Sequence, residues 1–143
     1  MRHRISAGAL VVDDGRILLV REEFSRAGPF WVAPGGGVEA DEELAAAAER
    51  EAREETGLAV RAGRLVYVED GFDGTTRTAK FWFLAALLDA PAEPAGDLTA
   101  QWFARDALPD EVYPLELHDR FWRDLEDGFP QGVVMLPLRR WRP

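Results

Sequence analysis

The chain of 143 residues contains no cysteine. This absence excludes a disulfide framework, a thiolate metal site and a cysteine nucleophile. It has only two histidines, His3 and His118, which are too far apart in sequence to match a metal-ligand spacing, so we expect both at the surface. No internal repeat, heptad run or low-complexity tract is present. The remaining chemistry must therefore use neither thiols nor paired imidazoles.

Long hydrophobic runs are also missing. Two arginines precede an apolar run at residues 5–12, but this run is short, contains Ser6 and Gly8, and ends at two aspartates without a cleavage site. We expect it to form a first strand rather than a signal or an anchor. The sequence thus predicts a soluble, cytoplasmic protein that does not contact a membrane.

Basic residues are fewer than acidic ones. Lys and Arg number 17 and Asp and Glu number 26, which gives a formal net charge of −9. Such a charge repels polyanions and argues against nucleic acid or an anionic membrane as a partner. A substrate that carries phosphate must then be bound by metal ions and a few arginines. With 47% hydrophobic residues, the length suits one domain over residues 1–143.

The predicted elements alternate between strands and two helices. Asp14-Gly15 is a strong signal for a two-residue hairpin turn, and the run at residues 78–88 is apolar on both faces, as in a central strand. We expect strands at residues 5–12, 16–20, 30–32, 64–69, 78–88, 101–103 and 133–138, and helices at 42–56 and 115–125. Loops are expected at 22–29, 70–75 and 89–97. Two helices on opposite faces of a mixed sheet predict an α/β fold, a three-layer α/β/α sandwich.

The stretch at residues 34–58 organises the chain, because a glycine-rich turn leads directly into a glutamate-rich helix. Asp41 is a suitable N-cap, and Gly57 can close the helix in the left-handed conformation. Three consecutive glycines before the helix allow a carbonyl group to face a metal and N–H groups to face phosphate.

Glu51, Glu54 and Glu55 share one arc of this helix, because residues advance by about 100° each. A solvated acidic face is the ordinary interpretation of such an arc. Three clustered carboxylates repel one another, however, and a divalent cation relieves that repulsion. Arg50 falls outside the buried stripe, where its i,i+4 pair with Glu54 is expected to contribute only about 0.2–0.5 kcal/mol.

These residues match the motif of a known family, and the chain resembles a Nudix hydrolase. The matching positions are Gly36, Glu42, Arg50, Glu51, Ala52, Glu54, Glu55, Gly57 and Leu58. The resemblance implies the α/β/α fold with a mixed sheet. It also implies metal-dependent hydrolysis of a pyrophosphate bond in a nucleoside diphosphate linked to another group, such as a nucleotide or a sugar.

The resemblance also implies roles for residues. Gly35, through its carbonyl group, and Glu51, Glu54 and Glu55 are expected to bind Mg²⁺ or Mn²⁺, and Arg50 to orient the carboxylates by charge-assisted hydrogen bonds. The general base is either Glu51 or an acid of a later loop. The sequence does not choose between the two later candidates, which are Glu93 and Asp97.

Substrate contacts are less well marked. Phosphate candidates are Arg21, Arg26, Gly36, Gly37 and Arg77, and candidates for stacking on a base are Phe24, Phe30 and Phe72. The sequence lacks asparagine, which argues against a reader of oxidised purines that depends on this side chain unless an aspartate takes its role. A homodimer is left open. The alternative function is a non-catalytic Nudix-like module that binds a nucleotide as a regulator, while a prenyl diphosphate isomerase would need a cysteine.

Overall fold

The computed structural model describes residues 1–23, 28–89 and 93–140. Within these ranges, ten strands form one mixed sheet whose main path has the order β10-β5-β6-β1-β2-β3-β8. The strands are β1 (Arg2–Asp13), β2 (Arg16–Glu22), β3 (Phe30–Val32), β4 (Gly35–Gly37), β5 (Val60–Phe72), β6 (Thr76–Leu87), β7 (Ala100–Ala104), β8 (Val112–Tyr113), β9 (Val134–Met135) and β10 (Arg139–Arg140). The helices are α1 (Leu44–Thr56) and α2 (Phe121–Glu126), with short 3₁₀ turns η1 (Arg105–Ala107) and η2 (Leu115–Leu117).

Strand β1 is the centre of the sheet. It pairs in parallel with β6 and antiparallel with β2 and β4. Asp14 and Gly15 connect β1 to β2 with φ angles of 51° and 72°, which confirms the predicted hairpin turn, because this turn type needs positive φ at both positions. Strand β6 lies between β1 and β5, as expected for an apolar run inside a sheet.

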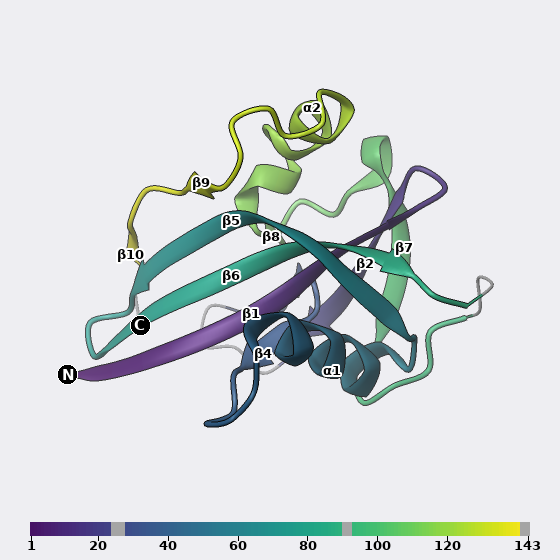
Figure 1. Cartoon of the computed structure of the whole chain (residues 1–143). Helices are drawn as coiled ribbons and strands as arrows, with labels where there is room; N and C mark the ends of the chain where they lie inside the picture. The colour runs from purple at the N-terminus through teal and green to yellow at the C-terminus, as the bar shows by residue number, and fades with distance from the viewer. Residues whose placement is uncertain (24–27, 90–92, 141–143) are drawn as a thin grey trace.

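Helix α1 covers one face of the sheet, and Figure 1 shows it beneath the long strands. Its buried side is made of Ala47, Ala48 and Ala52, which belong to one core cluster with Ala9 and Val11 of β1. Small side chains on both elements let the helix approach the sheet closely. This close approach brings the glutamates of α1 near the glycines of β4.

The other face is covered by η2 and α2, which lie on the far side of the sheet from α1 (Figure 1). Phe121 and Leu117 are fully buried there against Leu10, Tyr67 and Trp82 of the sheet. The two separate cores confirm the predicted α/β fold with a mixed sheet between helical layers.

Several predicted boundaries were wrong. The helix expected at residues 115–125 is divided into η2 and α2, and the indole N–H of Trp122 donates to the Leu117 carbonyl across the break at 3.0 Å. The late strand expected at 133–138 consists of β9 and β10. Strand β5 extends to Phe72, so the loop expected at 70–75 is shorter than predicted, and the glycines at 35–37 form β4 by pairing with β1.

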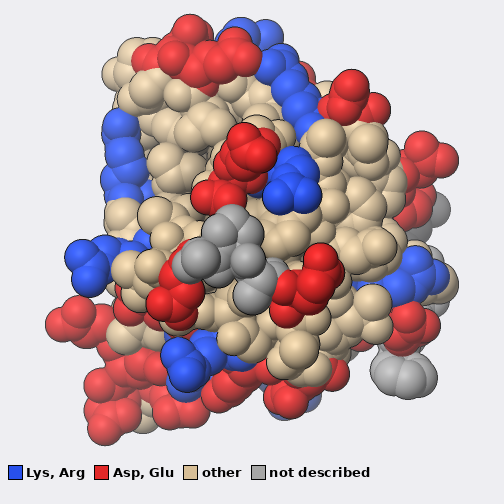
Figure 2. Space-filling view, turned by 90° about the vertical axis from the view of Figure 1, so that its right-hand side faces the viewer, with Lys and Arg blue, Asp and Glu red and all other residues tan. Residues whose placement is uncertain are grey.

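Acidic side chains outnumber basic ones on the face shown in Figure 2, where they gather at the lower left. His3 and His118 are both exposed, as predicted. None of the described helices is long and apolar enough to cross a membrane. The expected cytoplasmic location stays a prediction.

Candidate active site

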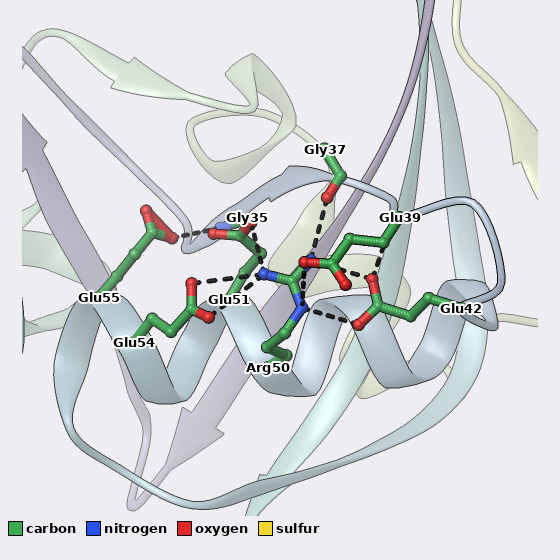
Figure 3. A network of polar contacts seen from close by, with 8 residues as sticks. All are labelled: Gly35, Gly37, Glu39, Glu42, Arg50, Glu51, Glu54 and Glu55. Atoms are coloured by element: carbon green, nitrogen blue, oxygen red, sulfur yellow. Dashed lines mark hydrogen bonds and ion pairs between the residues drawn. The ribbon is translucent and has the colours of Figure 1, made fainter.

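The guanidinium group of Arg50 is the centre of the polar network in Figure 3. It donates two hydrogen bonds to the carboxylate of Glu42, at 2.7 and 2.9 Å. Its Nη1 lies 3.1 Å from Glu51 and 3.3 Å from Glu54, while its Nη2 donates to the carbonyl oxygen of Gly37 at 3.1 Å. Arg50 therefore connects the turn before the helix with two of the motif glutamates.

Besides its expected i,i+4 pair with Glu54, Arg50 contacts Glu42, Glu51 and the carbonyl group of Gly37. The hydrogen bond from Arg50 holds the pKa of Glu42 below its usual range, and Glu42 in turn raises the pKa of Arg50. Glu42 also accepts the backbone N–H of Glu39 at 3.2 Å. The helix begins at Leu44, with Glu43 rather than the predicted Asp41 at the N-cap position.

Glu55 faces away from Arg50 and toward β4. Its Oε1 accepts the backbone N–H of Gly35 at 2.8 Å. Burial raises the pKa of Glu55 to about 7, the Gly35 hydrogen bond opposes this rise, and repulsion from Glu51 adds to it. The negative charge of Glu55 is therefore poorly compensated by the protein itself.

The three motif glutamates do not converge on one point in this arrangement. In the described ranges, no three carboxylate or imidazole side chains lie close enough to form a ready-made metal site. Glu51 and Glu54 contact Arg50, whereas Glu55 contacts Gly35 (Figure 3).

The residues nevertheless fit a divalent cation, because the donor set consists of hard oxygen ligands and the buried charge of Glu55 needs a counter-charge. Gly36 fits this interpretation too. A Cβ atom there would lie 2.6 Å from the carboxyl carbon of Glu51, so a larger residue would displace that carboxylate.

The segment at residues 95–98 packs on the last turn of α1. The backbone N–H of Asp97 donates to the Glu54 carbonyl at 2.9 Å, and the N–H of Leu98 donates to the Glu55 carbonyl at 3.1 Å. Gly96 is required for this contact, since a Cβ atom would lie 2.5 Å from the backbone of Glu55. The structure thus brings Asp97 beside the motif, while Glu93 is exposed and precedes this segment.

The predicted phosphate-binding arginines are used for other contacts or lie outside the described residues. Arg21 forms an ion pair with Glu23 at 2.9 Å, and Arg77 pairs with Asp70. Arg26 falls outside the described ranges, as does Phe24. Of the other aromatic candidates, Phe30 stacks edge to face on Tyr113 at 5.1 Å, and Phe72 belongs to β5 rather than to a loop.

Sequence reasoning missed Lys80 of β6 and a polar network beside it. Trp82 donates its indole N–H to Glu69 at 3.1 Å, and Arg139 of β10 lies between Glu69 and the buried Glu116. The signal for Lys80 was present, because it is the single lysine of the chain and interrupts an apolar strand. Arg139 had no such signal, since its partners lie 70 and 23 residues away.

A model of the NUDIX domain matches residues 2–132. The chain belongs to the Nudix family. The crystal structure of a MutT Nudix hydrolase from Burkholderia pseudomallei is 31% identical, with a TM-score of 0.69, and the match covers 80% of this chain and 92% of that one. The family resemblance of the motif is thereby confirmed over most of the chain.

Several other relatives of this Nudix domain carry names that mention a substrate, among them a phosphatase and a diphosphatase. The 8-oxo-dGDP phosphatase NUDT18 of Homo sapiens is 31% identical over 112 residues, which are 75% of this chain and 33% of that protein. The crystal structure of a UDP-X diphosphatase is 26% identical with a TM-score of 0.74, and the match covers 95% of this chain and 68% of that one. The chain spans about a third of the length of the curated relatives it matches.

Proposed function

We propose that this chain hydrolyses a pyrophosphate bond in a nucleoside diphosphate linked to another group, with Mg²⁺ or Mn²⁺ as cofactor. The observation that carries this proposal is the carboxylate of Glu55, which is largely buried at 2.8 Å from the Gly35 N–H and is repelled by Glu51. A buried, poorly compensated carboxylate beside a glycine turn suits a divalent cation and a phosphate group. The names of the 8-oxo-dGDP phosphatase and the UDP-X diphosphatase are consistent with a nucleoside diphosphate.

Glu51, Glu54, Glu55 and the carbonyl group of Gly35 would hold the metal. When bound, Mg²⁺ or Mn²⁺ supplies positive charge to the diphosphate and lowers the pKa of a coordinated water. Arg50 positions Glu51 and Glu54 through its hydrogen bonds at 3.1 and 3.3 Å. The proton of the attacking water would pass to Glu51 or to Asp97. The backbone N–H of Asp97 donates to the carbonyl group of Glu54, which keeps Asp97 beside the motif.

A panel of nucleoside diphosphates, triphosphates, sugar nucleotides and dinucleotides, incubated with Mg²⁺, tests this function. Products are separated by ion-exchange chromatography and followed by ³¹P NMR. We expect at least one diphosphate to yield a nucleoside monophosphate, and Glu54→Gln to lower the rate by orders of magnitude. Glu43→Gln is the matched control, because Glu43 is exposed on the same helix and makes no side-chain cap hydrogen bond. Equal rates for the two variants, or no cleavage of any member, would contradict the proposal.

A further inference from the structure

Lys80 lies on the face of the sheet opposite α1, and the proposed function gives this residue no role. On β6 it pairs with Ser6 of β1 and with Glu69 of β5, and Trp82 follows two residues later on the same face. On this face, Gly8 of β1 has no side chain and is the register partner of Gly35 in β4. No side chain at Gly8 therefore separates Lys80 from the glycine turn of the motif.

The side chain of Lys80 is directed toward the candidate active site. Its Cε lies 3.1 Å from the point where a Cβ atom of Gly35 would be, and Gly35 is the residue whose N–H binds Glu55. Its ammonium group lies 4.3 Å from the centre of the Trp82 ring, a cation–π contact that holds the side chain in place. Burial lowers the pKa of Lys80, and electrostatic attraction from Glu69 and Glu55 opposes this shift.

Lys80 differs from the arginines near the motif because it has no direct ionic partner. Among the described residues, no carboxylate lies within ion-pair or hydrogen-bond distance of its ammonium group, whereas Arg50, Arg21 and Arg77 are all paired. Arg4 of β1 is a second cation beside β4, with its Nη2 3.6 Å from the Cβ position of Gly37. Both cations therefore face the glycines of β4 with their hydrogen-bonding capacity free within the described part of the chain.

We propose that the ammonium group of Lys80, together with the guanidinium group of Arg4, binds the non-bridging oxygens of the substrate diphosphate and positions it against the motif glutamates. This proposal rests on the proposed function. A protein with a net charge of −9 and a row of carboxylates must offset repulsion of a diphosphate, and a compact ammonium charge beside Glu55 does so where the phosphate has to lie. Lys80 takes the place that Arg21, Arg26 and Arg77 were predicted to fill.

The single lysine makes a direct test available. Protein labelled with ¹³C-lysine gives one set of lysine side-chain NMR signals, which belong to Lys80. We expect the Cε signal to shift saturably on titration with methylenediphosphonate and Mg²⁺, with the dissociation constant that calorimetry gives for the same probe. A Lys80 signal that stays unchanged when the probe saturates the protein would overturn the proposal. This measurement needs no variant and no turnover.

Kinetics on the best substrate of the panel provide the second arm. We expect Lys80→Met to raise KM by at least about tenfold, with a smaller change in kcat, and Lys80→Arg to restore most of the affinity, because it keeps the charge. Arg105→Ala is the control, since Arg105 of η1 is exposed and pairs with Glu126 of α2. Unchanged KM in Lys80→Met would overturn the inference alone, whereas metal-independent turnover by the wild-type protein would overturn the proposed function alone.

Discussion

Replacing Glu55 by Gln separates the stability of the fold from the function of the site. The pKa of Glu55 is raised from 4.5 to about 7, chiefly by burial. The folded state holds the proton of the Glu55 carboxyl group more tightly than the unfolded chain does. Protonation of Glu55 therefore stabilises the fold fully below pH 4.5, and this stabilisation is lost as the pH rises through about 7. At about 1.4 kcal/mol per pKa unit, metal-free protein loses roughly 3 kcal/mol of stability from this one group.

Glutamine keeps an oxygen that accepts the Gly35 N–H but has no proton to lose. In chelator, we therefore expect Glu55→Gln to be more stable than the wild type at pH 8, and the difference in unfolding free energy to shrink by about 2 kcal/mol at pH 5. With Mg²⁺, the same variant should lose orders of magnitude in rate. Urea unfolding at both pH values and steady-state kinetics provide the measurements. A difference in unfolding free energy that does not change with pH, or a Glu55→Gln variant less stable than the wild type at pH 8, would refute the reasoning.

Two further changes test other contacts. Gly36→Ala would move the Glu51 carboxylate, because the added Cβ lies 2.6 Å from it; we expect kcat/KM to fall about a hundredfold with little change in Tm. Unchanged kinetics would contradict the glycine requirement. Arg139→Ala would leave Glu69 and Glu116 buried without a shared partner, so urea unfolding should show a loss of about 3–5 kcal/mol. A loss below about 1 kcal/mol would show that the network contributes little.

The features predicted correctly from the sequence depend on local chemistry. Asp14-Gly15 predicts a hairpin because the turn needs two positive φ angles, and Gly57 closes α1 with a φ of 75° for the same steric reason. The motif spacing identified the family, since the spacing itself places the glutamates on one helix. The substrate, the metal, the location and the roles of individual residues remain predictions.

The features that were missed depend on contacts between distant segments. The hydrogen bonds of Arg50 to the Gly37 carbonyl and to Glu42 were not predicted, because sequence spacing shows only its neighbours on α1. Lys80 stands out in the sequence as the single lysine, but its position beside Gly35 depends on the pairing of β1 with β4 and β6, which no local pattern specifies.

Binding of Mn²⁺ tests the central claim most directly, namely that the carboxylates of α1 hold the metal on which hydrolysis depends. Metal-free wild-type protein, Glu51→Gln, Glu55→Gln and the control Glu43→Gln are titrated with Mn²⁺, and free ion is counted by electron paramagnetic resonance. We expect the wild type and Glu43→Gln to bind alike, and the other two variants to bind at least about tenfold more weakly. Equal affinity in all four proteins would contradict the assignment of the metal site to α1.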